Sequence, residues 1–247
     1  MAETKKVALI TGANKGIGFE TAKQLGEQGI TVVVAARDQQ KADGAAQKLK
    51  AAGIDAYPVV LEITRSSDFP KVYDFLDKTF GKLDILINNA GVSEGGDDWM
   101  ANTAPTVTQK QLRDVFDTNF FGLIELTQTL LPLVRKSPAG RIVNLSSILG
   151  SLTLHADPAS PIYGSKMVAY NASKAALNSY TIHLAAALKD TPIKVNAAHP
   201  GWVKTDMGTS AAPMEIPDGA KTSVRLATLS ADGPTGGYFH MDQTLPW

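Results

Sequence analysis

The sequence predicts an α/β fold in which a doubly wound parallel sheet of about seven strands is flanked by helices on both faces. Short β-branched or apolar runs alternate with longer helical patterns along the 247 residues. The strand-like runs are almost continuously apolar, as expected of strands buried on both faces. Hydrophobic residues make up 44% of the chain, which is enough for a sizeable core.

Strands and helices are expected in alternating order. The strands are predicted at Val7–Ile10, Thr31–Ala36, Ala56–Leu61, Ile85–Asn88, Arg141–Leu145, Ile193–Ala198 and Gly237–His240. The helices are predicted near Gly18–Gln28, Gln39–Ala52, Ser67–Phe80, Gln109–Lys136 and Ala169–Lys189. Three irregular regions remain, and long loops in a compact domain are often functional: Val92–Thr108, Ile148–Val168 and Met207–Gly219. No linker divides the chain, so we expect residues 1–247 to form a single domain.

Composition argues against several classes of protein. Lys plus Arg and Asp plus Glu both total 24, and zero net charge gives no support for a nucleic-acid partner or a polybasic membrane surface. The absence of cysteine excludes disulfides, Cys-ligated zinc and thiol nucleophiles. The four histidines have no metal-ligand spacing, so no metal is expected. No run approaches 18 apolar residues, and the first apolar segment is too short for a signal peptide, which makes a cytoplasmic protein the default expectation.

A glycine-rich turn follows the first predicted strand and opens a helix. It reads Thr-Gly-Ala-Asn-Lys-Gly-Ile-Gly over Thr11–Gly18. Glycines let a backbone approach a pyrophosphate, and a helix N-terminus offers free N–H groups and partial positive charge. The spacing is G-x-x-x-G-x-G, not the G-x-G-x-x-G of many dinucleotide folds. A dinucleotide site is favoured over a tight turn without a ligand because a strand precedes this turn and a helix follows it.

Tyr170 and Lys174 stand four residues apart in a predicted helix, so their side chains share one face. An ammonium beside a phenol favours the phenolate, which predicts a lowered pKa for Tyr170. Such a tyrosine can pass a proton to a carbonyl oxygen near neutral pH. Because this spacing also occurs by chance in many helices, the surrounding motifs decide its meaning.

Six motifs in order along the chain resemble those of the short-chain dehydrogenase/reductase family. They are Thr11–Gly18, Asn88-Asn89-Ala90-Gly91, Asn119, Ser146-Ser147, Tyr170 with Lys174, and Pro200-Gly201 followed by Thr205. The resemblance covers nearly the whole chain. It implies a Rossmann-like fold, a nicotinamide dinucleotide cofactor and interconversion of carbonyls and alcohols.

The resemblance implies four catalytic residues. Tyr170 would be the general acid in the reductive direction, and Lys174 would lower its pKa and bind the nicotinamide ribose. Ser147, preferred over Ser146, would hydrogen-bond the substrate carbonyl oxygen and stabilise its developing charge. Asn119 would hold a water in a proton relay with the lysine.

The cofactor is expected to be NADPH. The position that discriminates between the dinucleotides aligns with the neutral Ala36, and Arg37 and Lys15 offer cations for a 2′-phosphate. Asp38 is expected to cap the next helix. His199 is interpreted as a structural histidine. The residues that the resemblance assigns to the cofactor are Gly12, Asn14, Lys15, Gly16, Ile17, Gly18, Arg37, Glu62, Ile63, Asn89, Ala90, Gly91, Tyr170, Lys174, Pro200, Gly201, Val203 and Thr205.

The segment between Ser147 and Tyr170 is longer than in many members of the family. This departure resembles the monomeric carbonyl-reductase subgroup and its plant relatives. We interpret the extra residues as a wall over a largely apolar pocket, with Trp202 and Met207–Gly219 opposite; a plain surface loop is the alternative. The insertion precedes the helix that often forms the family's dimer interface, so a monomer and a homo-oligomer both stay open.

The predicted function is NADPH-dependent reduction of a ketone or aldehyde to an alcohol. The expected partner is a small, largely apolar carbonyl substrate. An NAD(P)-dependent alcohol dehydrogenase working oxidatively is the nearest alternative. A non-catalytic dinucleotide sensor or scaffold on the same fold is a second alternative, although such proteins commonly lose the tyrosine or the lysine, and both are present here.

Overall fold

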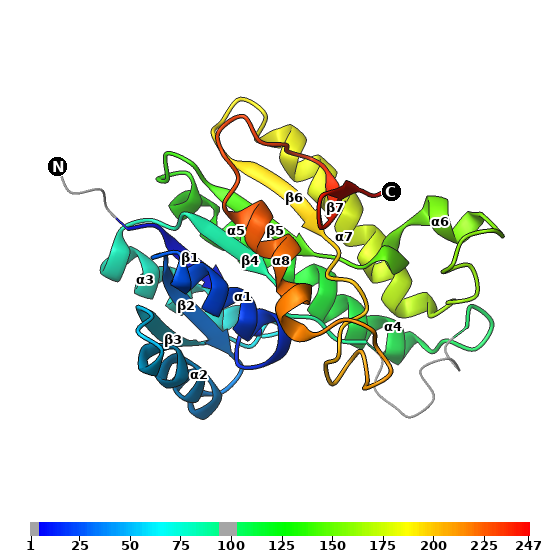
Figure 1. Ribbon diagram of the computed structural model, residues 1–247, viewed down its shortest axis with the longest axis horizontal. Helices are drawn as coiled ribbons and strands as arrows, with labels where there is room; N and C mark the ends of the chain where they lie inside the picture. The colour runs from blue at the N-terminus through cyan, green and yellow to red at the C-terminus, as the bar shows by residue number, and fades with distance from the viewer. Residues whose placement is uncertain (1–4, 94–102) are drawn as a thin grey trace.

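The computed structural model of the protein describes residues 5–93 and 103–247. The chain is built around one twisted sheet (Figure 1). The strand order in the sheet is β3-β2-β1-β4-β5-β6-β7-β8. The first seven strands pair in parallel and β8 pairs antiparallel with β7. Their bounds are β1 Val7–Ile10, β2 Thr31–Ala36, β3 Ala56–Val60, β4 Ile85–Asn88, β5 Arg141–Leu145, β6 Lys194–Ala198, β7 Tyr238–His240 and β8 Gln243–Thr244. The predicted doubly wound α/β fold is confirmed, and only the two-residue strand β8 was not expected.

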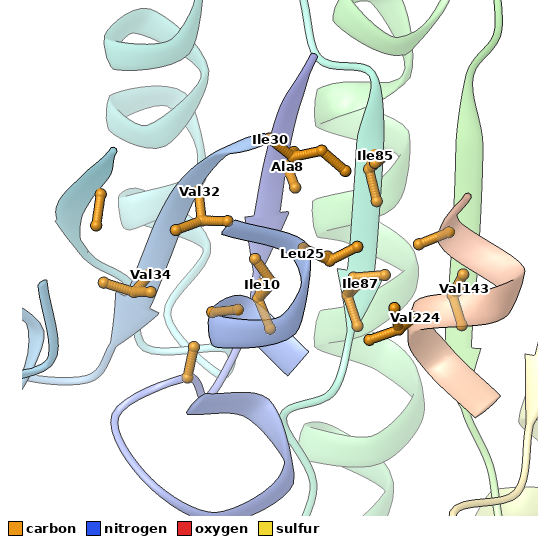
Figure 2. Packing of buried hydrophobic residues seen from close by; sticks show 14 of the residues in the cluster. Ala8, Ile10, Leu25, Ile30, Val32, Val34, Ile85, Ile87, Val143 and Val224 are labelled. Carbon is orange, nitrogen blue, oxygen red and sulfur yellow. The ribbon is translucent and has the colours of Figure 1, made fainter. Parts of the chain in front are cut away.

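Three helices cover one face of the sheet: α1 (Gly16–Glu27), α2 (Gln39–Ala51) and α8 (Ile216–Ala227). Figure 2 shows this core, where Ile10 of β1 lies near Leu25 of α1, and Val224 of α8 lies near Ile87 of β4 and Val143 of β5. Alternate residues of each strand contribute to this face because successive side chains of a strand point to opposite sides.

Three other helices cover the opposite face: α3 (Phe69–Phe80), α5 (Gly122–Val134) and α7 (Val168–Ala187). Val7 and Leu9 of β1 pack here together with Leu126 and Leu130 of α5. Both cores are made of side chains with almost no exposure, which explains why the strands read as continuous apolar runs.

The predicted helix Gln109–Lys136 is divided into three pieces. These are α4 (Gln109–Phe116), the π-helical segment η2 (Asp117–Phe121) and α5. A second difference is α8, which occupies a stretch that the sequence analysis left without a helix. Part of the irregular region Val92–Thr108 lies outside the described residues. None of the helices in the described ranges is long and apolar enough to span a membrane.

Candidate active site

The motif residues converge at the carboxyl edge of the parallel strands. Thr11 follows β1, Asn89 follows β4, Ser147 lies just beyond β5 and Pro200 just beyond β6. Because these strands run parallel, their carboxyl ends meet at one edge of the sheet, where open α/β sheets bind ligands. The fold therefore brings together motifs that are up to about 190 residues apart in the sequence.

The glycine turn is tied to the loop after β4 by hydrogen bonds. The Thr11 hydroxyl accepts from the Asn89 and Ala90 backbone N–H groups at 2.9 Å each, and the Asn89 side chain donates to the Thr11 carbonyl at 2.7 Å. Gly18 packs so tightly here that an added Cβ would lie 2.7 Å from the Gly12 carbonyl oxygen and would also collide with the Asn89 amide. The sequence Thr-Gly-x-x-x-Gly-x-Gly thus builds a turn braced by the second motif.

An open cavity of about 390 Å³ lies over this turn and the ends of β2 and β3. Among the described residues that line it are three cations, Lys15, Arg37 and Lys41, and one carboxylate, that of Glu62. Its shape and positive lining fit the adenosine and phosphate half of a dinucleotide. Of the predicted cofactor residues, it is lined by Gly12, Asn14, Lys15, Arg37, Glu62, Ile63, Asn89, Ala90 and Gly91.

Sequence reasoning missed several lining residues. Lys41 lies in the first turn of α2, where its ammonium contacts Asp38 at 2.6 Å. Asp38 caps that helix by accepting from the Lys41 backbone N–H at 2.9 Å, as expected, and these contacts lower the pKa of its carboxyl. The sequence signal that could have identified Lys41 is its spacing, three residues after Asp38 in the first turn of the predicted helix. The other unexpected lining residues are Leu61, Thr64, Val92 and Thr118, whereas Ala36 lines the cavity at the position expected to discriminate between the dinucleotides.

Ser147 and Tyr170 lie close together in the structure. Ser147 caps the short 3-10 helix η3 (Ile148–Gly150), and its side chain interacts with the Tyr170 phenol. Burial raises the pKa of Tyr170 above its ordinary value, and the interaction with Ser147 offsets only part of that rise. The expected lowering of the Tyr170 pKa is therefore not found, because burial outweighs the interaction with Ser147. The role of Lys174 toward this phenol stays a prediction.

Lys174 is almost fully buried one turn further along α7. Its ammonium donates to the Leu145 carbonyl at 2.8 Å and lies 5.7 Å from the centroid of the Tyr170 ring. Burial lowers the pKa of Lys174 to about 8. The two side chains therefore share one face of the helix, as their spacing predicted, but not in direct contact through the phenol oxygen.

Asn119 joins this cluster from the π-helical segment η2, a type of helix distortion that is frequent at functional sites. Its amide donates to the Val92 carbonyl at 2.8 Å and to the Ser173 hydroxyl at 3.0 Å, and its oxygen accepts from the Val92 N–H at 2.8 Å. The side chain is thus held by its neighbours on both sides. The water relay stays a prediction.

Gly91 connects the catalytic cluster to the cavity. It lines the cavity, and a Cβ added at Gly91 would lie 3.3 Å from the Asn119 oxygen and 3.5 Å from the Lys174 nitrogen. Two of the predicted catalytic residues, Asn119 and Lys174, thus adjoin the cavity at Gly91.

The two neighbouring serines have different partners. Ser146 donates to the buried Asn178 amide oxygen at 2.6 Å, whereas the Ser147 side chain lies close to the Tyr170 phenol. The geometry therefore favours Ser147 over Ser146 as the serine that meets a carbonyl oxygen.

The residues after β6 close over the glycine turn. Val203 is buried and forms a β-bridge with Met214, and a Cβ added at Gly16 would lie 3.6 Å from the Thr205 methyl group. Lys15 forms an ion pair with Asp206, next to Thr205. The predicted nicotinamide-side residues therefore lie beside the turn, outside the cavity described above.

The insertion between Ser147 and Tyr170 is folded against the protein. It contains α6 (Leu152–Ala156), and the Thr153 N–H donates to the Trp247 carbonyl at 2.9 Å. His155 contacts the Leu149 carbonyl at 2.9 Å, and the Lys166 ammonium donates to the His155 carbonyl at 2.7 Å. Most exposed large apolar side chains come from segments next to the site: Val92, Leu152, Tyr163, Trp202 and Met207.

Comparison with known proteins agrees with this arrangement. The profile of the short chain dehydrogenase family matches residues 6–216. The chain is 34% identical to (-)-isopiperitenone reductase of Mentha piperita, with 99% of each protein covered, and 33% identical to carbonyl reductase [NADPH] 1 of Mus musculus, with each fully covered. The crystal structure of NADPH-bound carbonyl reductase from chicken fatty liver superposes with a TM-score of 0.84 at 27% identity, covering 99% of this chain and 100% of that one. The protein belongs to the short-chain dehydrogenase/reductase family and is similar to its carbonyl reductases.

Proposed function

We propose that this protein reduces a ketone or aldehyde to an alcohol with NADPH, and that residues 1–247 act as one catalytic domain. The observation that carries the proposal is the cluster in which the Ser147 side chain lies close to the Tyr170 phenol and the buried Lys174 lies 5.7 Å from the Tyr170 ring, with Lys174 beside Gly91 of the cavity. Bound NADPH would supply the hydride for this reaction.

The chain's own residues orient the carbonyl and supply its proton. Ser147 and Tyr170 hold the substrate oxygen between two hydroxyl groups, and Tyr170 donates its proton as negative charge develops there. The raised pKa of Tyr170 keeps the phenol protonated near neutral pH, which suits the reductive direction over the oxidative one. Lys174 provides a positive charge that stabilises the phenolate left after proton transfer.

NADPH is proposed over NADH because the cavity lining, in the part of the chain that the structure describes, has three cations and one acid. Lys15, Arg37 and Lys41 would neutralise the 2′-phosphate, and Ala36 places no carboxylate against it. Relatives whose names include NADPH support the same choice. The exposed apolar side chains of the insertion and of Trp202 and Met207 suit a largely apolar substrate.

The test is oxidation of NADPH in the presence of a panel of ketones and aldehydes, followed by absorbance. We expect turnover with at least one apolar ketone. We also expect a kcat/KM at least roughly tenfold higher with NADPH than with NADH, because one charge-assisted hydrogen bond to the 2′-phosphate stabilises binding by about that factor. A chain that binds NADPH but reduces no carbonyl of the panel would fit the alternative of a non-catalytic dinucleotide sensor. Equal efficiencies with the two cofactors would overturn the cofactor assignment.

A further inference from the structure

His199 lies between the two turns that frame the proposed reaction centre. It follows β6 and is 8% exposed. Its Nδ1 accepts from the Ile148 N–H at 3.2 Å and from the Gly201 N–H at 3.4 Å. Ile148 directly follows Ser147, and Gly201 belongs to the turn expected beside the nicotinamide. One ring nitrogen thus joins the serine turn after β5 to the glycine turn after β6.

Both the backbone and the ring of His199 contact the neighbouring strand β7. The His199 backbone N–H donates to the Phe239 carbonyl at 2.7 Å, and the centroids of the His199 and His240 rings lie 4.9 Å apart. His240 Nδ1 is 3.0 Å from the His199 carbonyl oxygen. Since a carbonyl can only accept, that His240 nitrogen carries a proton. These contacts place His199 before any ligand binds.

The imidazole of His199 is neutral under ordinary conditions. Burial, with a smaller effect of His240, lowers the pKa of His199 to about 3. A neutral ring whose Nδ1 accepts hydrogen bonds carries its proton on Nε2. A proton on Nδ1 would face the N–H groups of Ile148 and Gly201, so three donors would meet with no acceptor between them. His199 is therefore a permanent acceptor at Nδ1 and takes no part in proton transfer.

The Gly201 turn has little freedom to reposition itself. Gly201 adopts φ +91°, a conformation that favours glycine, and an added Cβ would collide with the Met214 sulfur. Its N–H points at His199 in this conformation. His199 Nδ1 therefore binds a turn whose backbone conformation would be strained by any residue other than glycine at position 201.

We propose that His199 is a positioning residue for the reaction, holding the Ser147 turn and the Pro200-Gly201 turn at a fixed separation through Nδ1. The inference rests on the proposed function, because it assigns the two turns to the carbonyl oxygen and to the nicotinamide. His199 was interpreted as a structural histidine, and the proposal adds that the hydrogen bonds accepted by its Nδ1 affect kcat.

Matched substitutions separate the role of Nδ1 from a general packing role. The amide oxygen of His199→Asn can occupy the position of Nδ1, whereas that of His199→Gln reaches the position of Nε2. We expect His199→Gln to lower kcat by roughly tenfold or more, since small displacements of reacting groups are costly. We expect His199→Asn to retain most of the rate, and both variants to bind NADPH within about threefold of the wild type, because the cavity contacts dominate binding.

The exposed His183→Asn on α7 is the control for histidine replacement, and it is expected to leave kcat and KM unchanged. Equal kcat values for wild type, His199→Asn and His199→Gln would overturn the proposal. Equal losses in both variants, matched by equal losses of thermal stability, would also overturn it in favour of packing alone.

A second measurement does not depend on catalysis. Hydrogen exchange of the Ile148 and Gly201 amides should be slow in the wild type and in His199→Asn, and faster in His199→Gln. Fast exchange of both amides in the wild type would overturn the proposal that His199 Nδ1 holds the two turns, even if the variants failed to fold. Slow exchange of both amides in a protein that reduces no carbonyl would instead support the hydrogen bonds to His199 and contradict the proposed function.

Discussion

Lys174 is the residue whose protonation is expected to control the rate near neutral pH. Burial lowers the pKa of Lys174 to about 8, while burial raises the pKa of Tyr170. As pH rises through about 8, the lysine loses its charge and the tyrosine keeps its proton. Phenolate formation then lacks its cationic partner, so we predict that kcat/KM for reduction falls as pH rises through this range.

The matched variant for this prediction is Lys174→Met. It removes the titrating group, so its rate should be lower at pH 7 and its alkaline decline should move upward. The pH dependence of kcat/KM for both proteins measures this directly. An unchanged decline near pH 8 in Lys174→Met would show that another group controls the rate.

Arg37 offers a second prediction at the residue scale. It lines the cavity and is exposed at the end of β2. Arg37→Ala should weaken NADPH binding about tenfold, because the substitution removes a charge-assisted hydrogen bond to the 2′-phosphate, and should leave NADH binding nearly unchanged. Titration by fluorescence compares the two cofactors, with Lys78→Ala on the outer side of α3 as the control. A similar loss for both cofactors would contradict contact with the 2′-phosphate.

The spacing of residues in the sequence predicted which side chains lie together, but it did not predict how their surroundings shift their pKa values. Four-residue spacing was enough to place Tyr170 and Lys174 on one face of α7. The direction of the Tyr170 pKa depends on how far the folded chain excludes water from the phenol, and the spacing of residues along one helix does not encode this. Lys41 was missed for a related reason, since only the folded turn from β2 into α2 brings it to the cavity.

At the scale of elements, the insertion is the part expected to select the substrate. Leu152 is 69% exposed and Tyr163 44%, an unusual exposure for large apolar side chains next to a site. Deleting residues 153–161 should alter the preference among ketones more than it alters NADPH affinity. A milder test is Leu152→Ala combined with Tyr163→Ala.

That double variant should lower kcat/KM for bulky apolar ketones by roughly 100-fold and leave small ketones less affected, because each of the two apolar side chains covered by substrate contributes on the order of 1.5 kcal/mol. Ile182→Ala, another exposed apolar position on α7, serves as the control. An unchanged ranking of ketones would identify the insertion as a plain surface loop.

The elements that the sequence did not predict have identifiable causes. The π-helical segment η2 interrupts a continuous helical pattern, and its extra residue per turn leaves no mark on hydrophobic periodicity. The helix α8 begins at Ile216–Pro217, and proline there was interpreted as irregular structure although it is favoured in a first helical turn. The parallel strands were predicted almost to the residue because both of their faces are buried.

The whole molecule is expected to unfold as one unit that NADPH stabilises. Two cores share the single sheet, so loss of either exposes the other. We predict one cooperative thermal transition. At 100 times its Kd, NADPH should add about 2.7 kcal/mol, which raises Tm by roughly 5–10 °C for a chain of this size. Scanning calorimetry with and without NADPH tests this, and two separate transitions would contradict a single domain.

The most direct test of the central claim is the rate of carbonyl reduction by Tyr170→Phe, measured with a ketone that the wild type reduces. The substitution removes only the hydroxyl that donates the proton, so kcat should fall by at least roughly 100-fold while NADPH binding, followed by fluorescence, is retained. Tyr73→Phe on α3 is the matched control and should keep the wild-type rate. Wild-type turnover by Tyr170→Phe would contradict the assignment of Tyr170 as the proton donor.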